Sequence, residues 1–301
     1  MKLWEKLSGI IYKLISLPYL SVFKDNDPES VLKRSVFVMD TDALEQIRAY
    51  IRNLQTGSGA FPDKAGRDDL YYTLFGFYVT EALDMHELIP SVKSYLQSEF
   101  SEKHPTGVHL YCAAVLSAKT GMDITIKKNL KNEIRRAMNN QLNQQPAYTA
   151  FLTLLACYYV KDFNGIFLIK KQIDTFNSRT ALPCPVLAAL LVLRKSFRQP
   201  CEDITADILS FYDNAGGFRA TSAAPVPDLL STAVALYALH FAGTDLRRIK
   251  PDCLQFIESM YCEGGFSGNV LDTDTDIEYT FYGLLALGAL SAQQNDRKEN
   301  Y

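Results

Sequence analysis

The sequence lacks strong charge of either sign, paired cysteines and long apolar runs. Its 301 residues carry a formal net charge of −3 with acids and bases interspersed, which argues against a nucleic-acid partner. The six cysteines form no CxxC pair and mostly stand in apolar helical surroundings, so they predict a reduced cytoplasmic protein and not a disulfide framework. No uncharged apolar run reaches the roughly 18 residues that a membrane-spanning helix requires. The four histidines and the cysteines show no metal-binding pattern.

Sustained β-type alternation is also missing, and from Ser30 onward the pattern is helix and loop. The second helix of each successive pair is apolar nearly all round and should be buried, whereas the first is more charged and should lie outside. The sequence therefore predicts an all-α fold with an inner ring of six helices inside an outer ring of six. We expect helices at about residues 40–54, 69–84, 88–101, 106–119, 124–142, 147–160, 163–176, 183–196, 202–213, 228–242, 249–261 and 276–291.

Three copies of one unit run through this pattern. Residues 214–239 and 264–287 each contain a glycine pair followed by phenylalanine, then a loop, then an apolar helix. In both copies an aspartate follows the phenylalanine by ten residues and a threonine by fourteen, and a looser copy places them at eight and twelve. These pairs are Asp228 and Thr232, Asp276 and Thr280, and Asp69 and Thr73. Repetition of this kind predicts one closed body built from stacked units.

The first 17 residues form an amphipathic pattern that Pro18 ends. Two placements are open for this helix: packing on the outside of the body, or lying on the inner membrane face as a peripheral contact with Trp4 as anchor. The charged and polar residues 24–30 are interpreted as a linker. The predicted division is therefore 1–30 for the amphipathic helix and linker, 31–292 for the ring of helices, and 293–301 for a polar tail.

This arrangement resembles the α/α toroid shared by protein prenyltransferase β subunits and class II terpene cyclases, including squalene-hopene cyclase. The prenyltransferase repeat, a Gly-Gly-Phe followed by a loop, Asp-x-x-x-Thr and a helix, is matched by residues 216–232 and 264–280. The cyclase repeat is matched, with Phe in place of Trp, by Tyr50, Ile51, Gln55, Gly59 and Phe61. The resemblance covers roughly residues 40–290 and implies a six-fold double ring of helices.

The zinc ligands of the prenyltransferases do not carry over to this sequence. Those enzymes place Asp and Cys two residues apart at the start of one repeat helix, and a His at the start of the next. Asp228 matches the Asp, but Leu230 and Tyr279 stand at the Cys and His positions. The cationic pair that holds the prenyl diphosphate in those enzymes falls on Ser222 and Pro225 here, and Arg219 is the only basic residue nearby. The resemblance therefore implies no zinc site and no other cofactor, and it leaves magnesium open.

Class II cyclases start their reaction with a DxDDT motif, whose central carboxylic acid protonates an alkene or epoxide. The matching stretch here runs from Asp276 to Thr280, with Glu278 at the proton-donor position and Tyr279 at the neighbouring Asp position. A glutamic acid can donate a proton when burial raises its pKa. The candidate catalytic carboxyls are therefore Glu278, Asp276 and Asp228. The alternative is structural, because aspartates at these positions also cap helices.

Aromatic side chains of the expected inner helices are candidate substrate-binding residues. Inside a ring they would line a central funnel, where aromatic faces suit an isoprenoid or a carbocation; ordinary core packing is the alternative. With His109 and Arg219, the candidates are Tyr72, Phe75, Tyr111, Tyr148, Phe151, Tyr237, Tyr279 and Tyr282.

Two functions remain open at this point. One is an enzyme that handles an isoprenoid or similar apolar substrate in its funnel, by acid-initiated cyclisation. The other is a non-catalytic toroid that binds a lipid or a protein, or a β-type subunit that pairs with a helical partner chain. The enzyme predicts a buried carboxyl with a raised pKa facing the funnel, whereas the binding protein predicts carboxyls only at helix caps.

Overall fold

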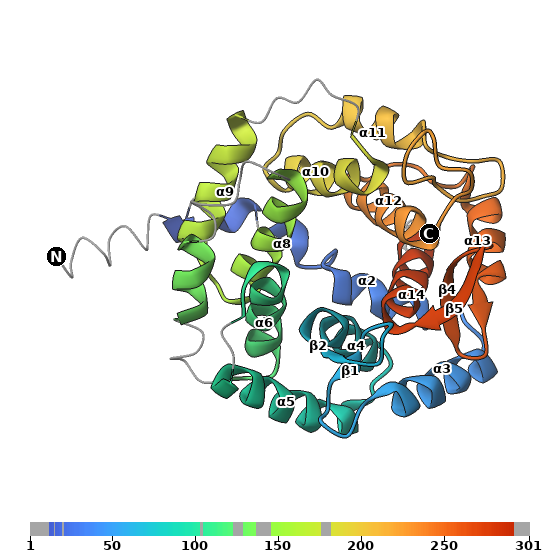
Figure 1. Cartoon of the computed structure of the whole chain (residues 1–301). Coiled ribbons are helices and arrows are strands. Elements are labelled where there is room, and N and C mark those ends of the chain that lie inside the picture. The colour runs from blue at the N-terminus through green and yellow to red at the C-terminus, as the bar shows by residue number, and fades with distance from the viewer. Residues whose placement is uncertain are drawn as a thin grey trace, which may run out of the picture.

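The computed structural model describes residues 12–14, 16–19, 21–102, 105–122, 129–136, 146–175 and 182–291. Six long helices pack side by side and close into a ring, because the last of them contacts both its predecessor and the first (Figure 1). In ring order they are α4 (Leu70–Ala82), α6 (Gly107–Lys119), α8 (Pro146–Tyr159), α10 (Cys184–Ser196), α12 (Leu229–Ala242) and α14 (Ile277–Ser291). The predicted all-α toroid is confirmed.

A second set of helices surrounds this ring (Figure 1). It consists of α3 (Thr41–Leu54), α5 (Ile89–Glu102), α9 (Phe163–Thr175), α11 (Glu202–Leu209) and α13 (Lys250–Ser259), with the 3₁₀ turn η2 (His86–Leu88) before α5. The two sets differ as their sequences predict. Helix α3 buries only one stripe (Leu44, Ile47 and Ile51), whereas α12 is buried around most of its circumference. The outer helix expected over 124–142 is described only at residues 129–136, which are helical.

Helix α11 ends at Leu209, four residues before the boundary that the sequence pattern suggested. The reason is local. Tyr212 forms an antiparallel bridge with Phe218, and the Phe211 carbonyl accepts a hydrogen bond from the Arg219 amide. These backbone groups cannot also continue the helix, so the chain turns into the repeat loop.

The three repeat loops share one hydrogen-bonding plan. The threonine hydroxyl accepts the backbone N–H of the repeat phenylalanine, at 3.0 Å in the first copy, 2.8 Å in the second and 3.3 Å in the third. In each copy the phenylalanine and the aspartate pair across an antiparallel ladder or bridge. The residue pairs are Phe61 and Thr73, Phe218 and Thr232, and Phe266 and Thr280. The Asp-x-x-x-Thr signature thus fixes the loop onto the start of its inner helix.

Short strands accompany these loops, although the sequence pattern predicted none. They are β1 (Phe61–Pro62) with β2 (Asp68–Asp69), and the meander β3 (Tyr261–Cys262), β4 (Gly265–Asn269) and β5 (Asp272–Asp276). The two-residue strands β1, β2 and β3 are too short to show alternation, and β4 is buried at four consecutive positions, so its burial does not alternate either.

One end of the ring is closed by the plug segment, residues 21–35, which comprises η1 (Ser21–Phe23) and α2 (Pro28–Ser35). Figure 1 shows α2 across the middle of the ring. Helix α2 packs extensively on α14 and also on α4, and Phe23, Val31 and Leu32 are fully buried. The interpretation of residues 24–30 as a linker is therefore wrong. Asp27 and Pro28 instead start a buried helix, with the Asp27 carboxylate accepting the Ser30 amide at 2.9 Å.

The amphipathic pattern of residues 1–17 falls mostly outside the described residues, and the polar tail 293–301 lies wholly outside them. Near the plug segment, the Ser16 hydroxyl donates to the Phe163 carbonyl at 3.1 Å. The Tyr19 ring stacks edge-on against Phe197 with centroids 5.5 Å apart. This part of the chain therefore rests on the outer surface at α9 and at the end of α10.

Candidate functional site

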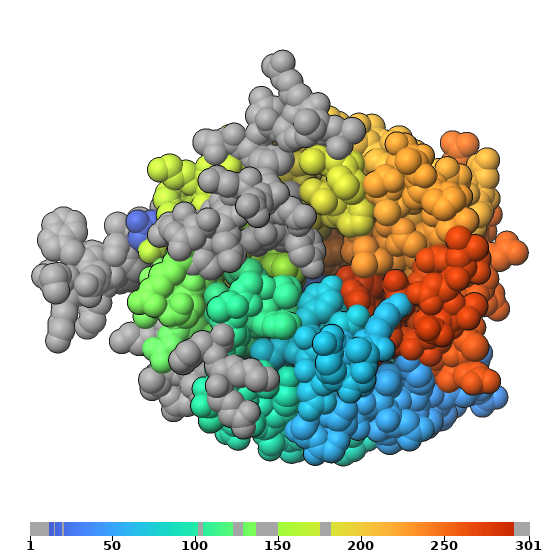
Figure 2. Space-filling model, in the orientation of Figure 1, coloured from blue at the N-terminus to red at the C-terminus, as the bar shows by residue number. Residues whose placement is uncertain are grey.

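The plug segment contacts the inner helices close to their C-terminal ends, which leaves the opposite end as the mouth of the ring. Four inner helices contact the plug segment through a residue in their C-terminal half. These residues are Lys119 of α6, Tyr158 of α8, Tyr237 of α12 and Gly288 of α14. The mouth is therefore formed by the helix starts and by the repeat loops that precede them. Figure 2 views this face and shows it hollowed in the middle, between atoms of α4, α6 and α12.

The Glu278 carboxyl lies at the mouth, in the first turn of α14. It accepts a hydrogen bond from the Tyr71 hydroxyl of α4 at 2.8 Å, and the Tyr72 hydroxyl is also hydrogen-bonded to it. Burial raises the pKa of Glu278 above the usual range of a glutamic acid, and the two tyrosine hydroxyls only partly oppose that shift. The nearby negative charge of Asp276 raises the pKa further. The protonated form of this carboxyl is therefore favoured relative to an exposed one.

Asp276 caps α14 and is partly neutralised by a lysine. Its Oδ1 atom accepts the Tyr279 amide at 2.7 Å, and its Oδ2 atom lies 3.7 Å from the Lys64 ammonium. Lys64 also reaches Asp272 at 3.2 Å and stands over the Tyr279 ring, 4.8 Å from its centroid. Burial raises the pKa of Asp276 too. Its cap geometry fixes the carboxylate toward the helix backbone, which is the structural alternative considered from the sequence.

Asp228 has the same role in α12, where it accepts the Ser231 amide at 2.7 Å. Burial raises its pKa. Arg219, the one cation near the repeat helix in the sequence, forms an ion pair with Asp213 of its own loop. The structure thus gathers Glu278 and Asp276 with Tyr72 and Tyr279, but it engages Asp228 and Arg219 in other contacts.

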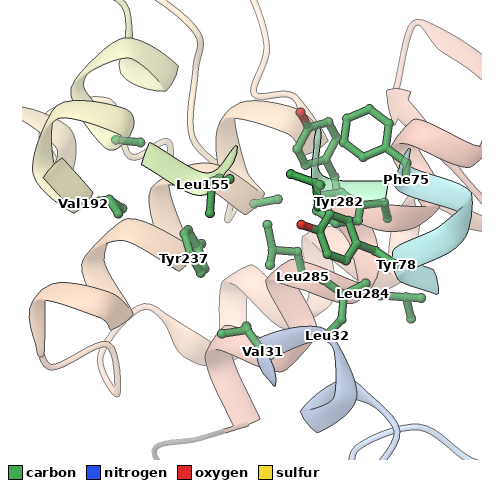
Figure 3. Close-up of a cluster of buried hydrophobic side chains, with 14 of the residues drawn as sticks. Val31, Leu32, Phe75, Tyr78, Leu155, Val192, Tyr237, Tyr282, Leu284 and Leu285 are labelled. Atoms are coloured by element: carbon green, nitrogen blue, oxygen red, sulfur yellow. The ribbon is translucent and has the colours of Figure 1, made fainter. Parts of the chain in front are cut away.

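Aromatic rings continue from Glu278 into the ring. Phe75 lies 4.6 Å from Tyr71, 4.7 Å from Phe281 and 5.6 Å from Tyr282, measured between centroids. Tyr78, one turn deeper on α4, lies 5.8 Å from Phe281. Figure 3 shows Phe75, Tyr78 and Tyr282 together in the interior, facing aliphatic side chains of the other inner helices. The carboxyl therefore stands at the head of an aromatic wall built by α4 and α14.

His109 lies beside this wall, with its Nε2 atom 3.0 Å from Asp69 Oδ2. Asp69 in turn caps α4 by accepting the Tyr71 and Tyr72 amides at 2.7 and 3.1 Å. An open depression of about 480 Å³ at the mouth is lined by Asp63, Lys64, Ala65, Arg67, Asp69, Tyr71, Tyr72, Val108 and His109. Its cations are paired, because Arg67 binds Asp63 at 2.7 Å and Lys64 binds Asp272.

The remaining candidates lie deeper. Tyr111 is 3% exposed and Phe151 is half-buried against the core. The Tyr237 hydroxyl donates to the Asn26 carbonyl of the plug segment at 2.8 Å, so this residue belongs to the closed end of the ring. Tyr148 lies in the first turn of α8, and its side chain is outside the described residues.

Sequence reasoning missed Lys64, which sits in an exposed loop with no motif. It also missed the position of Tyr78 and Tyr159 inside the ring. Periodicity could have identified Tyr78, which follows Tyr71 by two helical turns and Phe75 by three residues on the same apolar helix. No comparable signal marks Lys64, because only the folded β4–β5 hairpin brings Asp272 and Asp276 to it.

Among the described residues, no group of three or more His, Cys, Asp and Glu side chains is arranged to hold a metal ion. The expectations about zinc and magnesium stay predictions. Over the same described part of the chain, no helix combines the length and apolar character needed to cross a membrane.

Comparison with known proteins supports the assignment that the ring geometry suggests. Residues 154–300 match the family model of the prenyltransferase alpha-alpha toroid domain. A comparison with curated proteins gave no match. The matched region contains the C-terminal part of α8 and all of α9 to α14, and therefore two of the three repeat loops and Glu278. Residues 154–300 thus match a prenyltransferase alpha-alpha toroid domain, and the resemblance to the prenyltransferase and terpene cyclase toroids is confirmed.

Proposed function

We propose that this toroid takes an isoprenoid or a similar apolar chain into its ring and starts its cyclisation by proton transfer from Glu278. The observation that carries the proposal is the Glu278 carboxyl itself, which combines a pKa raised by burial with a position at the head of the aromatic wall. A neutral carboxylic acid can protonate an alkene, and aromatic faces stabilise the cation that forms.

Such a cyclisation needs no co-reactant, because the proton that starts it is released again at the end. The Glu278 proton adds to one carbon of a terminal alkene, and the resulting cation accepts the π electrons of the next alkene to form a carbon–carbon bond. Loss of a proton from a neighbouring carbon then leaves a cyclic isomer of the same mass. The rings of Phe75, Phe281 and Tyr282 lie where they can face that cation.

The charges at the mouth favour a ligand without a charged head group. Lys64 is paired with Asp272 and Asp276, Arg67 with Asp63, and His109 with Asp69. A diphosphate would have to displace these carboxylates and would meet their repulsion. The pattern therefore suits an isoprenoid alcohol or hydrocarbon better than a prenyl diphosphate.

A second candidate is a toroid that binds such a ligand, a lipid or a partner protein without chemistry. It is favoured by the repeat aspartates, because Asp69, Asp228 and Asp276 all serve as helix caps. In that case Glu278 would serve only to hold Tyr71 and Tyr72. A heterodimer with a helical partner chain belongs to this candidate, as does peripheral membrane contact through residues 1–17.

An experiment that measures both ligand binding and turnover distinguishes the cyclase from the non-catalytic binding protein. Native mass spectrometry of the purified protein identifies co-purified lipid, and the protein is then incubated with farnesol and the extract analysed by gas chromatography for cyclic isomers. We expect wild-type turnover to fall a hundredfold or more in Glu278→Gln with farnesol binding retained, as removal of a general acid requires. Glu258→Gln, the same substitution at an exposed glutamate of the outer helix α13, is the matched control. Binding without wild-type turnover supports the second candidate, and absence of any binding overturns both.

A further inference from the structure

Two tyrosine hydroxyls lie deep in the ring without a proper hydrogen-bond partner. They belong to Tyr78 of α4 and Tyr159 of α8, and both oxygen atoms are buried with no partner among the described residues. Tyr78 is 3% exposed. The two hydroxyls interact with each other, and neither of them has a further hydrogen-bond partner among the described residues. Buried polar groups are nearly always paired, so this cluster requires an explanation.

The topology places both groups inside the ring. Helices α4 and α8 are not neighbours, because α6 lies between them and packs on each. Side chains from α4 and α8 can therefore meet only on the inner side of α6. Figure 3 shows the Tyr78 hydroxyl pointing into the interior, toward the side where Leu155 of α8 and Tyr237 of α12 lie.

The surroundings form a polar floor at the closed end of the ring. The Tyr237 hydroxyl donates to the Asn26 carbonyl of the plug segment, and Asp27 is 8% exposed. The charge of Asp27 raises the pKa of both Tyr78 and Tyr159, in addition to the larger effect of their burial. Both tyrosines therefore remain neutral donors. The floor lies about 13 Å below the mouth, since Tyr78 follows Asp69 by nine residues at about 1.5 Å each.

We propose that Tyr78 and Tyr159 bind a neutral oxygen atom, a hydroxyl or a carbonyl, at the buried end of the isoprenoid ligand. The Phe75 and Phe281 rings above them are apolar, and the two hydroxyls are among the buried side-chain donors that lack a partner in the described part of the chain, together with those of Tyr111 and Ser117 on α6. Negative charge on the neighbouring Asp27 disfavours a carboxylate or a phosphate at this position. This inference rests on the proposed function, and it adds that the ligand enters with an oxygen-bearing end first.

The test compares farnesol with farnesene, which lacks the hydroxyl, by titration of the full-length protein. We expect the wild-type protein to prefer farnesol about two- to tenfold, as one hydrogen bond provides. Tyr78→Phe and Tyr159→Phe should each bind farnesol two- to tenfold more weakly and bind farnesene unchanged. Tyr212→Phe, whose hydroxyl bonds Asp252 in an exposed loop, is the matched control and should behave as wild type.

A second readout uses the ligand-free protein. Because the Tyr78 hydroxyl loses only its contact with the Tyr159 hydroxyl and relieves a buried polar group, Tyr78→Phe should leave the unfolding temperature unchanged or raise it. A lowered unfolding temperature would mean that the hydroxyl is already satisfied and would overturn the inference. Equal wild-type affinity for farnesol and farnesene would overturn it as well, as would a preference that disappears only in Tyr72→Phe at the mouth. If neither probe binds, the proposed function fails and this inference fails with it.

Discussion

The contact between α14 and the plug segment makes one substitution especially informative. Gly288 lies in the interior of α14, where a β-carbon would fall 1.9 Å from the Val31 carbonyl oxygen and 2.8 Å from its carbonyl carbon. Both atoms belong to the backbone of α2, so no side-chain rotation relieves the clash. Gly288→Ala must therefore displace α2 from the end of the ring.

The expected magnitude follows from two opposing effects. Overpacking of a well-packed interior costs about 1–3 kcal/mol, and a clash with backbone belongs at the upper end of that range. Alanine is favoured over glycine in a helix by about 1 kcal/mol. The net effect should be a loss of about 2 kcal/mol in the free energy of unfolding.

Urea denaturation followed by circular dichroism measures this loss, and amide hydrogen exchange reports whether α2 opens. Gly57→Ala is the control, because a β-carbon there meets nothing within 4 Å. Helix propensity alone predicts that Gly288→Ala is more stable than wild type. A variant of equal or greater stability would therefore refute the packing of α2 on α14.

Three further predictions concern the loops and the carboxyl at the mouth. Thr232→Val removes the hydroxyl that accepts the Phe218 amide at 2.8 Å and should cost about 1–3 kcal/mol in urea denaturation, whereas Thr232→Ser keeps most of the stability. Asp228→Ala should lose about 1 kcal/mol of stability because it removes the helix cap, and Asp228→Asn should lose much less. Thermal unfolding of the two variants measures the difference, and equal losses would contradict a capping role for Asp228. The folded pKa of Glu278 is raised by burial, so its contribution to stability is present below about pH 4 and is lost as pH rises through the raised pKa. Urea denaturation at pH 4 and pH 7 should therefore show Glu278→Gln gaining stability relative to wild type as pH rises, and a constant difference would refute the shift.

The ring itself could be predicted because its helices are strongly patterned and its loops repeat. The Asp-x-x-x-Thr spacing located three inner helices within a residue or two, since it describes a local hydrogen-bonding plan around Phe218 and Phe266. The sequence also predicted that Glu278 lies at the start of the last inner helix, because this position depends only on its distance from Thr280 along one helix. Both features could be predicted because each depends only on residues that are close together along the chain.

The plug segment and the contacts of Lys64 could not be predicted in the same way. Asp27 and Pro28 are typical of a helix start, but six polar or charged residues and one proline in residues 24–30 suggested a linker. Their burial depends on partners about 90 to 210 residues away, such as Lys119 and Tyr237. Likewise the pairing of Lys64 with Asp272 spans 208 residues and follows from the closed ring. Neither contact leaves a periodic signal in the chain.

The plug segment has a consequence for how the chain is made. Helix α2 leaves the ribosome before the six helices of the ring, yet its most extensive partner is α14, which is the last of them to be synthesised. Until α14 appears, the apolar side chains of Val31 and Leu32 have no complete surface to pack on. Domains dominated by such long-range contacts fold late and depend on both ends of the chain. A nascent chain that stops before residue 277 would hold an open ring with its first helix unpaired, which makes it a natural substrate for chaperones and proteases.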